Sequence, residues 1–153
     1  MNPSQLFVYG TLRHDQPEHE RYCRGVTGWR RARIRGQLWR IPEGYLLLEV
    51  PQASVLMEAA DDADADEFRR LQLDVPAPAD GEWPWIEGEV LSFRNASEAW
   101  PPIDAWEGFV TGKSNVYPRC VVPVEILDGG GWSRDLAWAY ATLRVPPASV
   151  VLG

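Results

Sequence analysis

Short apolar runs, each ended by glycine or proline, make up most of the chain and predict strands rather than long helices. The first run, Leu6 to Tyr9, lies in a predicted buried strand over residues 5–9 and stops at Gly10. Further strands are predicted at residues 29–39, 45–50, 85–93, 116–127 and 136–142, the first of them with a break near Gly36. Many strands with few short helices favour an α+β fold built around a curved or closed sheet.

Three segments have helical composition instead. Residues 17–24 begin with Pro17, which suits the first turn of a helix, and residues 59–72 are rich in Ala, Asp and Arg. Residues 95–106 are predicted as two helical pieces, because Pro101 and Pro102 interrupt the pattern. The second piece is expected to end at Gly108.

The composition is that of a single globular domain over residues 1–153, with 45% apolar and 24% charged residues. No apolar run is long enough to cross a bilayer, so we expect no membrane partner, and the N-terminus has no secretory pattern. Cys23 and Cys120 are the only cysteines, and neither has metal-ligand spacing. We therefore expect a cytoplasmic protein without disulfide or metal site.

Negative charge is concentrated in an acidic insertion expected at about residues 53–83. Residues 56–82 contain nine Asp or Glu and two Arg, a net charge of −7 that equals the charge of the whole chain. We interpret this segment as a solvated surface that is helical in part. The net negative charge of the chain disfavours a nucleic acid partner, because it repels phosphates. The near-alternating Arg30, Arg31, Arg33 and Arg35 suit the solvent face of a strand and need no nucleic acid to explain them.

The turn after the first strand is a candidate anion site. Gly10 allows a positive φ and the close approach of a ligand. Consecutive N–H groups over Gly10, Thr11 and Leu12 can form a nest for a carboxylate, to which Thr11 adds a hydroxyl. An ordinary strand-to-loop turn is the alternative explanation of the same residues.

The carboxylate of Glu107 is a second candidate, at the end of a helical segment and close to Trp106 and Phe109. The negative end of a helix and the aromatic neighbours both disfavour its ionised form, which suits a general base working near neutral pH. Asp104, three residues earlier, can share the helix face. A solvated glutamate is the alternative.

Residues of the strands are candidate pocket walls, and most of these candidates are aromatic. They are Trp39, Tyr45, Tyr117, Arg119 and Tyr140. His14 and His19 have no carboxylate or cysteine at metal spacing, so we assign them no role. The chain has no serine nucleophile elbow, P-loop or dinucleotide-binding glycine motif, which favours acid–base chemistry without a cofactor.

Five segments, in their order and approximate spacing, resemble the γ-glutamylcyclotransferase-like family, also called AIG2-like, which includes γ-glutamylamine cyclotransferases. They are residues 8–13 (VYGTLR), 87–90 (EGEV), 103–109 (IDAWEGF), 117–119 (YPR) and 137–140 (AWAY). The resemblance covers nearly the whole chain apart from residues 53–83. It implies a small mixed β-barrel flanked by short helices.

The resemblance also implies an activity, the release of 5-oxoproline and a free amine from a small γ-glutamyl amide, without metal or cofactor. In the family a carboxylate at the position of Glu107 is the catalytic acid/base. The implied substrate-binding residues are Tyr9, Gly10, Thr11 and Leu12 for the glutamyl part, and Tyr117, Arg119 and Tyr140 for the pocket wall.

The sequence departs from the family in places that bear on the leaving amine. His14 and Asp15 stand where many relatives have a Pro-Gly pair, Leu46 follows Tyr45 where proline is usual, and the acidic insertion is long. The identity of the amine and the oligomeric state are therefore left open. A non-catalytic small-molecule binding or sensor protein that uses the same pocket is an alternative, as is a scaffold acting through the acidic segment.

Overall fold

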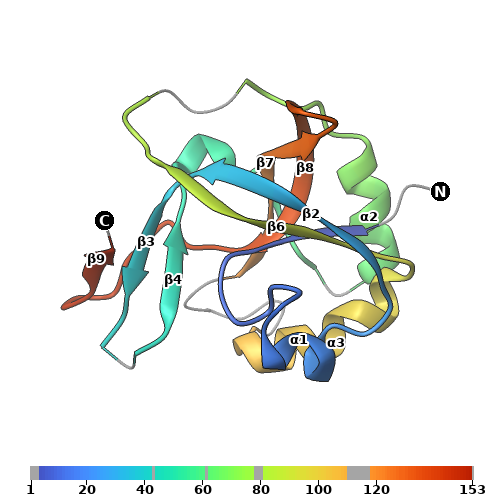
Figure 1. The fold of residues 1–153 in the computed structure, drawn as a ribbon, viewed down its shortest axis with the longest axis horizontal. Coiled ribbons are helices and arrows are strands. Elements are labelled where there is room, and N and C mark those ends of the chain that lie inside the picture. The colour runs from blue at the N-terminus through green and yellow to red at the C-terminus, as the bar shows by residue number, and fades with distance from the viewer. Residues whose placement is uncertain (1–3, 43, 61, 78–80, 110–117, 153) are drawn as a thin grey trace.

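The computed structural model describes residues 4–42, 44–60, 62–77, 81–109 and 118–152 (Figure 1). The strands are β1 (Ser4–Val8), β2 (Val26–Arg35), β3 (Gln37–Arg40), β4 (Leu46–Glu49), β5 (Met57–Glu58), β6 (Trp85–Phe93), β7 (Arg119–Asp128), β8 (Gly131–Tyr140) and β9 (Val150–Leu152). The helices are α1 (Pro17–Tyr22), α2 (Ala63–Leu71) and α3 (Ala96–Glu107), with a 3-10 turn at Gln52–Ser54. Within these ranges, none of the helices has the length and apolarity needed to cross a membrane.

Five strands close into a ring. The order is β2-β6-β1-β8-β7, β2 pairs again with β7, and β5 adds to β7. β1 and β8 run parallel where Leu6 pairs with Trp138, whereas the other pairs in this sheet are antiparallel. The β7–β8 hairpin is the longest ladder, from Arg119 opposite Tyr140 to Asp128 opposite Gly131. The predicted α+β fold with a small mixed barrel is thus confirmed.

A smaller antiparallel sheet, ordered β4-β3-β9, stands beside the barrel (Figure 1). Only Gly36 separates β2 from β3, so the predicted break is confirmed there. The pattern did not predict β5 and β9, because strands of two or three residues show no measurable periodicity. β8 begins at Gly131 rather than at residue 136, since its first four residues are exposed and carry no alternating pattern.

Helix α3 is continuous, so the prediction of two helical pieces was wrong. Pro101 and Pro102 both lie inside the helix, where they remove hydrogen bonds to the carbonyls of Ser97 and Glu98. Ser97 and Glu98 are exposed, so water can satisfy those carbonyls. Burial of Trp100 (2% exposed) against the barrel stabilises the helix around the prolines.

Helix α2 belongs to the acidic segment, yet part of it is buried. Asp66 is 0% exposed and accepts a hydrogen bond from the backbone N–H of Ala60 at 3.0 Å. Arg70 is 5% exposed and donates to Glu67 Oε2 at 3.0 Å, and the other oxygen of Glu67 accepts from the indole N–H of Trp138. The predicted helix exists, but the interpretation of a wholly solvated face was wrong, because α2 is anchored to the barrel.

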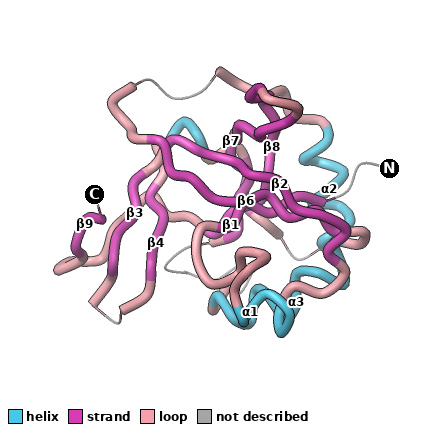
Figure 2. Tube along the Cα trace, viewed as in Figure 1, coloured by secondary structure: helices cyan, strands magenta, loops and turns pink. Residues whose placement is uncertain are grey.

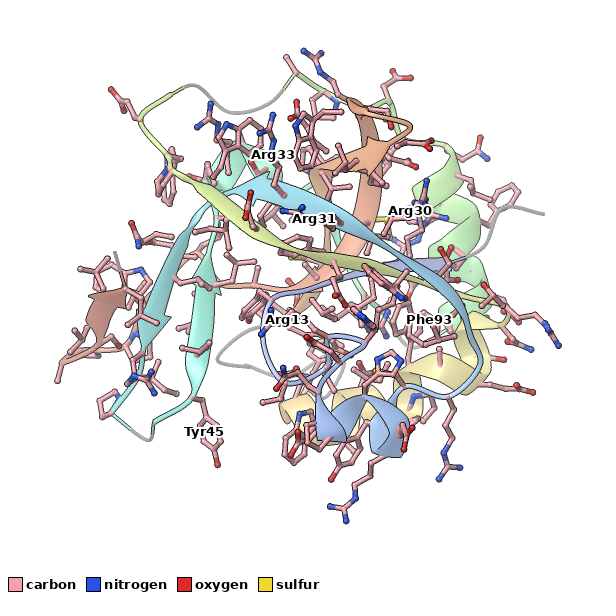
Figure 3. The ribbon with its side chains drawn as sticks, in the orientation of Figure 1. Arg13, Arg30, Arg31, Arg33, Tyr45 and Phe93 are labelled. Carbon is pink, nitrogen blue, oxygen red and sulfur yellow. The ribbon has the colours of Figure 1, made fainter. Side chains whose placement is uncertain are left out.

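Arg31, Arg33 and Arg35 alternate along β2 with the buried Ala32 and Ile34 and lie on the outer face of the strand, as predicted (Figure 3). Arg30 departs from the prediction, because it donates to Oε1 of the buried Gln5 at 2.9 Å. Arg33 donates to Glu125 Oε1 from Nε and Nη2 at 2.9 and 2.7 Å. Its guanidinium carbon also lies 4.2 Å from the ring centroid of Trp85 and 3.9 Å from that of Trp132. Arg35 stacks on Trp85 at 3.9 Å. These two arginines are therefore engaged by a carboxylate and by aromatic rings.

Gly88 allows β6 to pass close to the end of β1. A Cβ atom at this position would lie 2.3 Å from the carbonyl oxygen of Val8 and 2.8 Å from the ring of Phe7. No side chain fits at such distances, so the packing requires glycine here.

We expect Gly88→Ala to lower the free energy of unfolding by about 2 kcal/mol, because β1 must shift to make room. Urea denaturation measures the change. Gly28→Ala on β2 is the matched control, since its Cβ would meet nothing within 4 Å. It should change stability by less than about 1 kcal/mol. Equal midpoints for the two variants would contradict the close approach.

We expect Glu67→Ala to cost about 3 kcal/mol, because Arg70 and the Trp138 indole both lose a buried acceptor. Asp64→Ala, at an exposed position of the same helix, should change stability by no more than about 0.5 kcal/mol. Thermal unfolding of both variants tests this, and similar melting temperatures would argue against the anchoring of α2.

Candidate active site

The loop after β1, here called the Gly10–Leu12 loop, leaves three backbone N–H groups available. Arg13 closes the turn by donating from its backbone N–H and its Nε to the carbonyl of Gly10, both at 3.2 Å. Among the described residues, the N–H groups of Gly10, Thr11 and Leu12 have no acceptor. A Cβ on Gly10 would meet nothing within 4 Å, so an anion has room to approach.

Gly10 does not use the conformational freedom that the sequence suggested. Its φ lies outside the positive region, which among the described glycines includes Gly25 and Gly108. Glycine at position 10 therefore supplies space for an approaching group rather than a left-handed backbone.

Leu12 contributes its backbone to this loop, because its side chain is only 3% exposed and lies in the apolar core. Its carbonyl accepts hydrogen bonds from Nδ1 of His19 at 2.9 Å and from the thiol of Cys23 at 3.9 Å. Thr11 is exposed. The loop is thus fixed to α1 through one carbonyl, while its amides remain available.

Tyr9 joins the start of this loop to β8. Its side chain is half-buried, and its hydroxyl donates to the carbonyl of Tyr140 at 3.1 Å. The rings of Tyr9 and Phe7 stack at a centroid distance of 6.3 Å. Two of the predicted substrate-binding residues, Tyr9 and Tyr140, are therefore in direct contact.

A buried ion pair holds the side chain of Tyr140. Arg119 is 2% exposed and donates from Nε and Nη2 to the two oxygens of Asp104, at 3.0 and 3.2 Å. The hydroxyl of Tyr140 donates to Oδ1 of the same carboxylate. Burial and then the negative charge of Asp104 raise the pKa of Tyr140 well above its ordinary value, although Arg119 opposes the shift. The hydroxyl therefore stays protonated and continues to donate.

Arg119 and Asp104 also border an open cavity of about 560 Å³ between α2 and α3. Trp100 and Phe109 line the same cavity, with ring centroids 4.5 and 5.7 Å from the guanidinium carbon. Nη1 of Arg119 is buried and has no hydrogen-bond partner. It is a strong donor that the described part of the protein leaves unused.

Glu107 is the last residue of α3. Gly108 follows with a φ of 72° and donates to the carbonyl of Ala105 at 3.3 Å, so a left-handed glycine ends the helix at that point. Glu107 itself is half-buried. Its negative charge, second to burial, contributes to raising the pKa of the Cys23 thiol to about 12, and it also adds to the upward shift at Tyr140. Glu107 therefore acts on both residues through its charge.

Contacts of the neighbouring turn connect the end of α3 to the Gly10–Leu12 loop, since Asp104 accepts a hydrogen bond from the hydroxyl of Tyr140, and the carbonyl of Tyr140 accepts one from Tyr9. Figure 2 shows the loop after β1 above α1 and α3. The ring of Tyr22 on α1 stacks on Trp106 of α3 at 4.5 Å, which fixes the two helices against each other.

The structure brings only some of the predicted site residues into contact with one another. Tyr9 binds the carbonyl of Tyr140, and the Tyr140 hydroxyl and Arg119 both bind Asp104. Tyr117 lies outside the described residues. Trp39 and Tyr45 belong to the small sheet and its hairpin. The indole of Trp39 donates to Glu49 at 3.1 Å, and Tyr45 is 63% exposed at the hairpin (Figure 3).

One pair of residues beside the loop was missed. His14 was assigned no role, yet it meets Glu89 of β6, 75 residues away in the chain. Polar–apolar alternation could have placed Glu89 on a strand, but only the pairing of β1 with β6 brings it to His14.

Ligand atoms of His14, Asp15 and Glu89 lie within 4.8 Å of one another, but both oxygens of Glu89 already bind His14, so we assign no metal there.

Comparison with known proteins identifies the family and the fold of this chain. A family model described as gamma-glutamyl cyclotransferase, AIG2-like, matches residues 6–149. Among solved structures, an AIG2-like protein from Mus musculus superposes with a TM-score of 0.52 at 18% sequence identity, covering 96% of this chain and 82% of the mouse chain. That similarity shows a shared fold. No curated protein sequence matches significantly. The family match over nearly the whole chain shows that the protein belongs to the gamma-glutamyl cyclotransferase, AIG2-like family.

Proposed function

We propose that the protein is a γ-glutamylcyclotransferase-type enzyme that releases 5-oxoproline and a free amine from a small γ-glutamyl amide. Membership of the family supports the reaction class. The observation that carries the proposal is the chain of contacts from the end of α3 to the loop: Asp104 binds Tyr140, the carbonyl of Tyr140 accepts from Tyr9, and the loop that follows Tyr9 has backbone N–H groups without an acceptor among the described residues.

The proposed reaction is an intramolecular aminolysis. The α-amino nitrogen of the glutamyl group attacks its own side-chain carbonyl carbon, a C–N bond forms, and a five-membered ring closes. The bond from that carbon to the leaving nitrogen then breaks. The α-nitrogen begins as an ammonium with three protons and ends as a lactam N–H. Its two lost protons balance the two that convert the leaving nitrogen into an ammonium.

Glu107 is the proposed general acid/base for these transfers. As a carboxylate it accepts a proton from the α-nitrogen, and as a carboxylic acid it delivers a proton to the leaving nitrogen. Acid–base help of this kind accelerates a reaction by roughly 10²–10⁴-fold. Its half-buried position at the end of α3 supports this role, since a base must be shielded enough to exchange protons with a bound ligand.

The larger contribution comes from holding the substrate in a folded-back conformer. The amides of Gly10, Thr11 and Leu12 are proposed to bind the α-carboxylate and so direct the amine at the carbonyl. Effective molarities of about 10⁵–10⁸ M are typical of well-oriented intramolecular reactions. No step of this chemistry needs an external oxidant, reductant or group donor, and a cofactor-free enzyme is therefore proposed.

Tyr140 and Arg119 are proposed to shape the pocket rather than to move protons. The Tyr140 hydroxyl is committed to Asp104 and stays protonated, while Arg119 keeps one unused nitrogen that can bind a carbonyl or carboxylate oxygen. Tyr9 offers an aromatic wall next to the loop, and Tyr117 remains predicted as a second one from the family resemblance alone.

Glu107→Gln should lower turnover by about a hundredfold or more, because the amide keeps the shape of the side chain but cannot accept the proton. Release of 5-oxoproline from γ-glutamyl amino acids, γ-glutamyl amines and γ-glutamyl-lysine measures this. Glu98→Gln, on the exposed first turn of the same helix, is the control and should retain activity. Full activity of Glu107→Gln would refute the assignment, and ligand binding without product in the unmodified protein would indicate a sensor instead.

The position of Glu107 can be tested without turnover. In Glu107→Gln the thiol of Cys23 loses a negative neighbour, so its pKa should fall and its thiolate fraction at a given pH should rise. We expect alkylation of Cys23 at pH 8 to accelerate by about twofold or more. Cys120 serves as the internal control, since burial and Glu58 rather than Glu107 raise its pKa. An unchanged Cys23 rate would argue against the proximity of Glu107.

A further inference from the structure

We propose that Glu89 and His14 are positioning residues that hold the Gly10–Leu12 loop in its ligand-binding conformation. The proposal rests on the proposed function, because it assumes that this loop binds the substrate carboxylate. Neither residue belongs to the loop or touches Glu107 in the described contacts, so their effect is exerted through the backbone of the loop.

The side chain of Glu89 binds one residue at two places. Oε1 accepts a hydrogen bond from the backbone N–H of His14 at 2.7 Å, and Oε2 lies 2.5 Å from Nδ1 of the His14 ring. Glu89 is only 7% exposed. A carboxylate this buried needs such partners, and hydrogen bonds to a carboxylate are stronger than those between neutral groups. Backbone and side chain of His14 are therefore fixed together.

The barrel also holds His14 from a second direction. The imidazole stacks on Trp29 of β2 with a centroid distance of 3.6 Å and an interplanar angle of 9°. β2 and β6 are paired strands, and Arg31 lies opposite Glu89 in their ladder. The ring is thus bounded by a carboxylate from β6 and an indole from β2, two strands that are paired with each other.

Glu89 connects to both ends of the loop. Its backbone pairs with Val8, the last residue of β1, while its side chain binds His14, the residue after the turn that Arg13 closes. A single residue of β6 therefore fixes where the loop leaves the barrel and where it returns. The intervening amides have no acceptor of their own among the described residues, so this anchor is what orders them.

Glu89→Ala is the first test. We expect KM for a γ-glutamyl amide to rise by about tenfold or more with kcat changed less than about threefold, because loss of the anchor lowers the fraction of molecules whose loop is ready to bind, whereas a substrate that is bound is held in the same folded-back conformer. The dissociation constant for 5-oxoproline, measured by calorimetry, should rise in parallel.

Glu89→Gln keeps an acceptor for the backbone N–H of His14, so its KM should stay within about threefold of that of the unmodified protein. Glu87→Ala, two residues earlier with a 68% exposed side chain, should be unchanged.

His14→Ala gives an independent variant in which the backbone hydrogen bond to Glu89 survives. Its KM should rise less than that of Glu89→Ala. The KM of the double variant should not exceed that of Glu89→Ala, because both substitutions act on the same anchor. Additive effects, or a Glu89→Ala protein whose KM is unchanged or whose loss lies only in kcat, would overturn the proposal.

A measurement independent of activity separates this inference from the proposed function. Backbone ¹⁵N order parameters of Gly10, Thr11 and Leu12 should fall in Glu89→Ala and remain high in Glu87→Ala and Glu89→Gln. If the unmodified protein forms no 5-oxoproline, the proposed function fails, and the order parameters still decide whether Glu89 holds the loop. Unchanged order parameters in Glu89→Ala would overturn the anchor whatever the activity.

Discussion

The carboxylate of Asp104 joins the helices to the barrel, and the geometry of the candidate site depends on it. Burial removes water from both charges of an ion pair, so the hydrogen bonds that replace the water decide how well the pair is held. Here both oxygens of Asp104 bind Arg119 of β7, and one also binds Tyr140 of β8. The last turn of α3 is thereby tied to a strand pair, which fixes the position of Glu107 one turn further on.

Much of the barrel could be predicted because its strands are local patterns. The apolar run before Gly10 and the β-branched run of β7 both ended where turn residues stand, and Gly36 divided β2 from β3 as expected. The family motifs predict that the loop and Glu107 belong to one site although they lie far apart in the chain, and this stays a prediction. The strands themselves can be predicted from local periodicity, because burial on one face of a strand repeats every second residue.

The remaining features depend on contacts that no local pattern encodes. Two adjacent prolines predict a helix break, yet burial of Trp100 keeps α3 continuous. A run of acidic residues predicts a solvated surface, yet Asp66 is completely buried as an acceptor for the backbone. His14 looked unpartnered, because Glu89 reaches it only through the antiparallel register of β1 and β6. In the first two cases tertiary burial outweighs a local preference, including the cost of about 3 kcal/mol that an interior proline carries. The third depends on strand pairing between distant segments.

Closure of the ring is uneven, and this has a dynamic consequence. β2 and β7 meet over two residue pairs, Ala32 with Ile126 and Arg33 with Glu125, whereas β7 and β8 are paired along their whole length. Regions with few ladder bonds open first in native-state fluctuations. β1 and β8 are joined by a single pair, Leu6 with Trp138, which is fewer than at the seam between β2 and β7. The joint between β1 and β8 is therefore where the ring opens most easily, and such an opening shifts the strand that leads into Tyr9 and its loop relative to Tyr140 at the end of β8.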